Sequence, residues 1–133
     1  MPAISLTTGS ILASADSADG RISTQIEIIH ATGSNGSPTV SGWAKNVGSV
    51  EISPLTRVDV FFGPETDFVR IGQGAPGCTA PCWYYSIENS NRWTPTATIH
   101  ITVTWDSNLQ TGTTYYLKLV APNGISDARF FTV

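Results

Sequence analysis

Apolar and polar residues alternate along several short stretches of the chain, most regularly in residues 96–105 (TATIHITVTW). The odd positions there are apolar, and the even positions are threonine or histidine. A period of two predicts a strand in a sheet with one buried and one solvent-facing side. The predicted buried side consists of Ala97, Ile99, Ile101 and Val103, and the predicted solvent side of Thr98, His100, Thr102 and Thr104.

Other β-type runs recur at short spacing between clusters of turn-forming residues, without the period of an amphipathic helix. These runs cover residues 21–31, 39–46, 47–54, 55–63, 68–72, 83–89, 113–120 and 126–133. This rhythm predicts an all-β fold, an immunoglobulin-like antiparallel β-sandwich of about eight strands. Tyr115 follows Gly112 by three residues at the start of a late strand, which is typical of the tyrosine corner in such sandwiches.

The same alternation leaves several large side chains on the solvent side of their predicted strands. They are Trp43, Phe61, Tyr116, Val120 and Phe131. Outward aromatic and apolar residues either pack beneath loops or take part in interfaces. We therefore take Trp43, Tyr116 and Val120 as candidate contact residues.

Composition narrows the class of protein. The 133 residues suit one domain, which we expect at 21–133, after a Ser/Ala/Thr-rich leader at 1–20. Only 13% of residues are charged and the net charge is −3, so no basic surface for nucleic acid or for an anionic membrane is expected. No stretch approaches the roughly 18 to 20 apolar residues of a membrane-spanning helix.

The residue types needed for catalysis or metal binding do not gather in any known pattern. His30 and His100 stand apart, with no cysteine or histidine at ligand spacing. The carboxylates near Asp16 and Glu65 lack the ligand series of a calcium loop. There is also no nucleophile-elbow, P-loop or dinucleotide motif. We therefore expect no enzyme, no cofactor and no metal.

The two cysteines of the chain, Cys78 and Cys82, lie in the segment GCTAPCWYY. Three residues separate them, whereas thioredoxin-type chemistry uses two, and a zinc site would need further ligands nearby. Gly77 and Pro81 favour a turn that could bring the two Cα atoms within disulfide range. A disulfide in an oxidising compartment is the favoured interpretation, and a pair of free thiols is the alternative.

Several segments in the order WAKNVGSVEI, VDVFFGPETDFVRI, WYYSIENSNRWTPTATIHITV and GTTYYLKLVAPNGISDARFFTV resemble the archaeal flagellar protein G family. The resemblance covers about residues 23–133. Archaeal flagellar protein F and the archaellins share part of this pattern, notably the residues KNVG. The cysteine pair is not part of the family pattern.

The resemblance implies a β-sandwich outside the cytoplasmic membrane, in the stator of the archaellum motor. It implies an N-terminal membrane helix in the full-length protein, and residues 1–20 would then be the end of that helix together with residues added for expression. The implied partners are archaeal flagellar protein F and further copies of the chain, in an oligomer or filament, with an indirect link to the S-layer. Contact with the membrane would be through the missing helix only.

Two other classes of function stay open. An archaellin-like or adhesin-like filament subunit would differ chiefly in its native N-terminus. A secreted carbohydrate-binding sandwich is suggested by the four tryptophans, Trp43, Trp83, Trp93 and Trp105. It requires some of these rings to be exposed for stacking on sugars.

Overall fold

The computed structural model of the chain describes residues 24–88 and 90–133. The leader assigned to 1–20 lies outside the described residues, as do the first three residues of the predicted sandwich domain. The described part contains eight strands and one 3₁₀ turn. In chain order these elements are β1 (Ile26–Gly33), β2 (Thr39–Asn46), η1 (Leu55–Arg57), β3 (Asp59–Pro64), β4 (Val69–Gln73), β5 (Cys82–Ile87), β6 (Thr98–Thr104), β7 (Thr114–Val120) and β8 (Ser126–Thr132).

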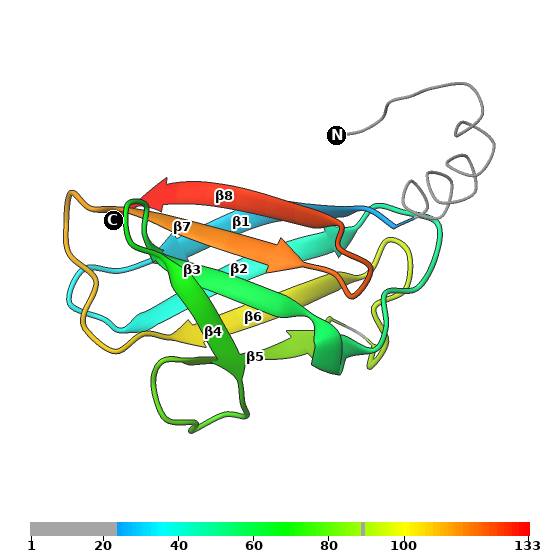
Figure 1. Ribbon diagram of the computed structural model, residues 1–133, viewed down its shortest axis with the longest axis horizontal. Coiled ribbons are helices and arrows are strands. Elements are labelled where there is room, and N and C mark those ends of the chain that lie inside the picture. Colours follow the sequence, from blue (N-terminus) through cyan, green and yellow to red (C-terminus); the bar gives the residue numbers. More distant parts are fainter. Residues whose placement is uncertain (1–23, 89) are drawn as a thin grey trace, which may run out of the picture.

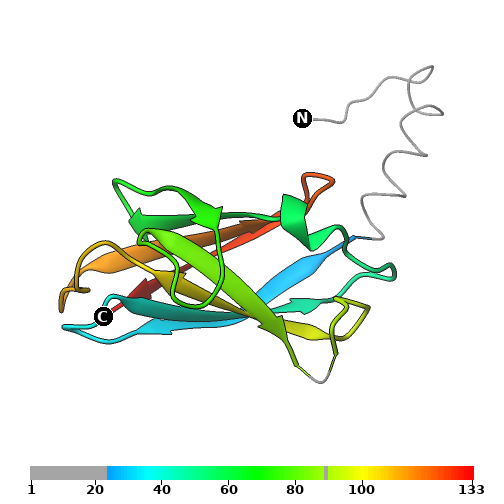
Figure 2. The same cartoon turned by 90° about the horizontal axis from the view of Figure 1, so that it is seen from below.

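The strands form two facing layers, which are separated most clearly in Figure 2. One layer has the order β1-β2-β6-β5 and the other β4-β3-β7-β8. This order corresponds to the two sheets of the immunoglobulin fold, so the predicted all-β sandwich is confirmed. Residues 47–54, which the sequence pattern included among the strand-like runs, form a loop with a single bridge between Ile52 and Trp93.

One pairing departs from the antiparallel arrangement predicted from the sequence. Strands β4 and β5 pair in parallel over two residues, Gly72 with Cys82 and Gln73 with Trp83. The loop at 74–81 joins them and carries the chain from one layer to the other (Figure 1). A parallel pair needs a longer connection than a hairpin, and this Gly/Pro-rich loop supplies it.

The core lies between the layers and is built from the alternation seen in the sequence. Ile99, Ile101 and Val103 of β6 are buried, as predicted. They face Leu117 and Leu119 of β7 across the sandwich core, with all five side chains at most 1% exposed. Alternate residues of β6 and β7 are half-buried on the outer faces.

The predicted tyrosine corner is present. The hydroxyl of Tyr115, at the start of β7, accepts a hydrogen bond from the backbone N–H of Gln110 at 2.9 Å. Gly112, inside this corner, has a φ of +86°, which non-glycine residues rarely adopt. The corner ties the loop between β6 and β7 to the edge of the core.

The strands at the two outer edges, β1 and β8, are linked through side chains. Asp127 and Arg129 of β8 both reach the backbone of Ile28 in β1. The pairing of β1 with β2 shifts register between Ile28 and His30, so a bulge lies at the same place. These contacts close the open side of the sandwich and occupy part of a strand edge that could otherwise pair with another chain.

Candidate protein-interaction surface

The outer face of β3, β7 and β8 carries a row of aromatic side chains, which we call the aromatic ladder: Phe68, Tyr116 and Phe130. The ring centroids of Phe68 and Tyr116 are 4.4 Å apart, and those of Tyr116 and Phe130 are 5.0 Å apart. Phe68 is 42% exposed and Phe130 is 56% exposed. Large aromatic rings exposed together are more typical of a contact surface than of an isolated monomer face.

Strand β7 continues this face beyond the ladder. Tyr116, Lys118 and Val120 are all half-buried on its outer side, as the alternation predicted. The Lys118 ammonium lies 5.9 Å from the centre of the Phe61 ring, and Asp59 forms an ion pair with Arg70 close by. Val120 pairs in register with Asp59 of β3, at the far end of the strand from the ladder. The face therefore has aromatic residues at one end, charged residues along its middle, and Val120 beside Asp59 at the other end.

The prediction that Phe131 faces outward is wrong. Its ring packs inward, with centroids 6.2 Å from Phe62 and 5.8 Å from Tyr115, and it is Phe130 that faces solvent. The sequence presents two adjacent phenylalanines near the chain end, and a one-residue error in register exchanges the two faces. The alternation gives no signal for Phe68, because this residue lies in the turn before β4, outside any alternating strand.

Trp43 also faces outward, but on the opposite layer, so the structure does not bring it together with Tyr116 and Val120. Its ring is stacked between two histidines of neighbouring strands. The centroids lie 4.6 Å from His100 and 5.5 Å from His30. Within the described residues the buried Nε2 of His100 has no hydrogen-bond partner.

The tryptophans do not form a platform for sugars. Trp83 and Trp93 are at most 1% exposed, and Trp105 packs edge-on against Phe62. Both ring faces of Trp43 are covered by the flanking histidines. Carbohydrate stacking needs an open ring face, so the sugar-binding alternative loses the feature that suggested it.

Cys78 and Cys82 are joined by a disulfide bond in the structure, with their Cα atoms 6.3 Å apart. The bond closes the end of the loop that leads into β5. Gly74 lies against it, since a Cβ at this position would come within 2.7 Å of the Cys78 Cβ. The loop therefore has room for this bridge only because residue 74 lacks a side chain.

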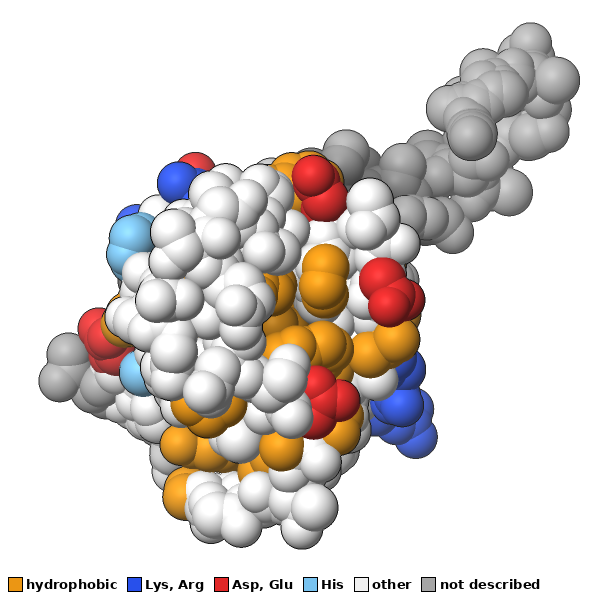
Figure 3. Space-filling view, turned by 90° about the vertical axis from the view of Figure 1, so that its left-hand side faces the viewer, with side chains coloured by type: hydrophobic (Ala, Val, Ile, Leu, Met, Phe, Trp, Pro, Cys, Tyr) orange, Lys and Arg blue, Asp and Glu red, His pale blue; other side chains and the backbone are white. Residues whose placement is uncertain are grey.

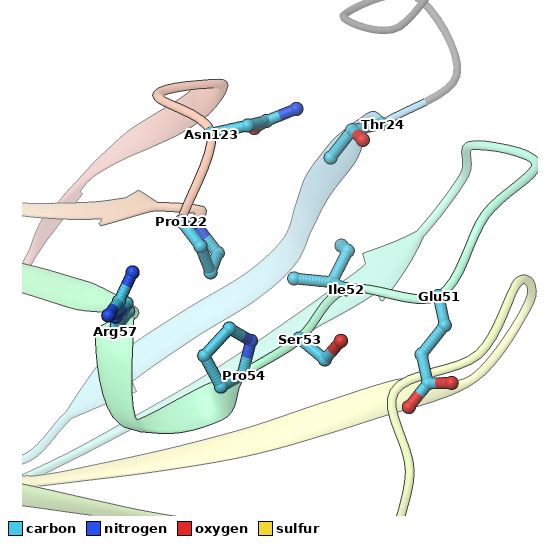
Figure 4. Close-up of a pocket in the computed structure, with 8 residues that line it drawn as sticks. All are labelled: Thr24, Glu51, Ile52, Ser53, Pro54, Arg57, Pro122 and Asn123. Atoms are coloured by element: carbon cyan, nitrogen blue, oxygen red, sulfur yellow. The ribbon is translucent and has the colours of Figure 1, made fainter.

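A pocket of about 290 Å³ lies at one end of the sandwich, where residues from four segments meet (Figure 4). It is lined by Thr24, Glu51, Ile52, Ser53, Pro54, Arg57, Pro122 and Asn123. Arg92 binds the Glu51 carboxylate from outside this pocket. The hydrogen bond from Arg92 holds the pKa of Glu51 below its ordinary value, with a smaller contribution from charge attraction, while burial acts in the opposite direction.

Two further findings concern the described residues only. No three metal-ligating side chains lie close enough together to hold an ion. None of the helical structure in these residues has the length and apolar character of a membrane span.

The fold and the exposed aromatic ladder define a class: an immunoglobulin-like sandwich whose functional groups are on its surface. No protein-family model and no curated protein sequence matches the chain. Several solved structures do match it. The archaellum periplasmic stator protein FlaG from Sulfolobus acidocaldarius is 30% identical with a TM-score of 0.71, over 81% of this chain and 99% of that one.

Two other solved structures are similar. A chain of the FlaF–FlaG stator complex of the same organism is 26% identical, with a TM-score of 0.70, over 98% of this chain and 100% of that one. The archaeal flagellin FlaB1 from Methanocaldococcus jannaschii has a TM-score of 0.71 over 83% of this chain and 90% of that one, at 10% identity, and this shows a shared fold alone. The chain belongs to the FlaG family of archaellum stator proteins, as its sequence motifs indicated.

Proposed function

We propose that this chain is an extracytoplasmic structural part of the archaellum stator that binds a FlaF-type sandwich and also associates with its own copies. The family supports the stator role, and a chain of a FlaF–FlaG complex is among the similar structures. Catalysis plays no part in this proposal. A stator must resist torque, so its work is to hold partners in place through protein contacts.

The observation that carries the proposal is the aromatic ladder on the outer face of β3, β7 and β8. Burying exposed aromatic rings is a main source of binding free energy at protein interfaces. Tyr116 lies in the middle of the ladder, and Val120 is a second apolar residue on the outer side of the same strand, beyond Lys118. We propose these two residues as contacts, with Trp43 belonging to a separate contact on the other layer.

The proposal includes a location. The sandwich would lie between the cytoplasmic membrane and the S-layer, held by an N-terminal membrane helix in the full-length protein and linked to the S-layer through its partner. The disulfide between Cys78 and Cys82 is consistent with an oxidising compartment. Such an arrangement gives the motor an anchored part that resists its torque.

The test is to mix residues 21–133 with the soluble domain of the matching FlaF protein, and to measure masses by size exclusion with light scattering. We expect a complex of both domains, and concentration-dependent association of this domain alone. Phe130→Ser should weaken binding to FlaF, whereas Thr132→Ser on the same strand should not. A domain that stays monomeric and ignores FlaF at high concentration would contradict the proposal.

A further inference from the structure

The two ends of the sandwich differ in charge. One end is formed by the β1–β2, β3–β4 and β6–β7 connections and the last residue, because these strands alternate in direction. It contains Glu65, Asp67 and Asp106, and no lysine or arginine. We call it the acidic end. Figure 3 looks onto it and shows acidic side chains beside an apolar band, with basic side chains only at the margins.

The opposite end holds the pocket described above. Its two charged lining residues are Glu51 and Arg57. Glu51 is engaged by Arg92, and in Figure 4 its carboxylate points away from the other lining side chains. Arg57 has no ion-pair partner within the described residues. The pocket therefore presents one exposed guanidinium that no carboxylate of the described chain neutralises.

The other lining groups suit a polypeptide segment. Pro54 and Pro122 give apolar contact above the buried Ile52, and Ser53 and Asn123 can form hydrogen bonds at the rim. At about 290 Å³ the pocket is at the lower limit for small-molecule sites, and half of its lining residues, Ser53, Pro54, Arg57 and Asn123, are exposed. An arginine beside an apolar floor favours a carboxylate on a protein turn that also carries an apolar side chain.

The β3–β4 turn at the acidic end has this chemistry. Glu65 and Asp67 are exposed on it, and Phe68, also exposed, follows directly. The turn is short and held by a hydrogen bond from the Asp67 N–H to the Pro64 carbonyl at 2.8 Å. A turn that is already ordered loses little conformational entropy on binding.

We propose that the pocket around Arg57 receives the β3–β4 turn of a second copy of the chain, with Glu65 or Asp67 paired to Arg57. The contact joins opposite ends, so it is heterologous, and a pair of copies keeps one free turn and one free pocket. Repetition of such a contact gives an open filament rather than a closed dimer. This inference rests on the self-association in the proposed function, and it names the surfaces involved.

The first test compares charge variants. Arg57→Glu removes the cation of the pocket, and Lys45→Glu on β2 makes the same change in net charge at a residue that belongs neither to the pocket lining nor to the turn. The double variant Glu65→Gln, Asp67→Asn neutralises the turn, with Glu27→Lys on β1 as its matched control. We expect at least about tenfold weaker self-association for the pocket and turn variants, as for charge pairs at protein contacts, and little change for the controls. Added salt should weaken the parent's association.

The second test uses the head-to-tail geometry. A pocket-blocked copy (Arg57→Glu) still has its turn, and a turn-blocked copy (Glu65→Gln, Asp67→Asn) still has its pocket. Mixing ¹⁵N-labelled pocket-blocked chains with unlabelled turn-blocked chains should produce mixed pairs in excess of like pairs in native mass spectrometry. Pairs in a random statistical ratio would overturn the proposal.

The outcomes separate this inference from the proposed function. If the Arg57→Glu variant self-associates as strongly as the parent, the head-to-tail contact is ruled out and the stator role is unaffected. If the parent stays monomeric but binds FlaF, the head-to-tail contact and the self-association part of the proposed function are contradicted, while FlaF binding stands. If the parent neither self-associates nor binds FlaF, both the head-to-tail contact and the proposed function are contradicted.

Discussion

The carboxylate of Asp127 in β8 accepts a hydrogen bond from the backbone N–H of Ile28 in β1, at 2.8 Å. The guanidinium of Arg129 donates to the carbonyl of the same residue at 3.2 Å. Two side chains of one edge strand thus take the positions that a neighbouring strand's backbone would have. This protects β1 from pairing with another chain at Ile28, and it favours assembly through faces and ends of the sandwich.

Asp127→Ala should lower the free energy of unfolding by about 1–3 kcal/mol, since it leaves a partly buried N–H without its charged acceptor. Ser126→Ala, at the adjacent and exposed position, is the control. Urea denaturation measures the difference, and amide hydrogen exchange locates it. Unchanged protection of the Ile28 amide in Asp127→Ala would show that the contact contributes nothing.

The core of β6 gives a second prediction. Ile101 is 1% exposed between the layers, whereas its neighbour Thr102 is half-buried on the outer face. Ile101→Ala should therefore cost about 2–5 kcal/mol of stability, because it removes buried methyl groups and leaves a cavity. Thr102→Ala should cost far less. Equal losses in thermal or urea unfolding would be incompatible with the register described.

The strength of the sequence-based prediction varied with the kind of signal. Regular alternation in β6 and β7 was enough to assign buried and exposed sides, and a glycine–tyrosine spacing was enough for the tyrosine corner around Tyr115. The pattern around the doublet Phe130–Phe131 is not enough to assign its buried and exposed sides, because it fits either register. Here the choice depends on which ring can pack against Tyr115 and Phe62 on the inner face of the same layer.

Features made by distant segments gave no local signal. The parallel pairing of β4 with β5 depends on where a loop leads the chain, and the aromatic ladder includes Phe68 from a turn. The pocket combines Thr24, Arg57 and Asn123, which are far apart in sequence. Fold class could be predicted because it follows from short-range periodicity, whereas these sites depend on which loops meet at one end.

The disulfide gives a third prediction. In protein made under oxidising conditions, Cys78 and Cys82 should be bonded, and intact mass should be lower by two hydrogens than after reduction. Replacing both cysteines with serine should cost about 2 kcal/mol, because the closed loop is short, and the fold should persist. Two free thiols in native, unreduced protein would show that the bond does not form.

The ion pair between Glu51 and Arg92 gives a fourth prediction. The hydrogen bond from Arg92 lowers the pKa of Glu51 in the folded state. A lowered folded pKa stabilises the protein at pH values above the ordinary glutamate pKa, and this contribution is lost as the pH falls through the lowered value. Arg92→Gln should move the Glu51 pKa back up, as measured by carboxyl ¹³C chemical shifts during a pH titration. An unchanged Glu51 pKa in the Arg92→Gln variant would show that the ion pair does not form in solution.

The last prediction concerns the proposed contact face. Val120 is half-buried on the outer side of β7, beyond Lys118 and in line with Tyr116. Val120→Lys places a charge where a partner's surface would have to exclude water, so association should weaken by several kcal/mol if the contact is central.

The fold should tolerate this change, because an outward strand position leaves the lysine ammonium in water. Circular dichroism and thermal unfolding test that point, and light scattering with and without FlaF tests assembly. Thr104→Lys, half-buried on the outer side of β6 in the opposite layer, is the matched control. If Val120→Lys assembles like the parent while its fold is intact, this end of β7 is not part of the contact, and the aromatic ladder around Tyr116 must then act without it.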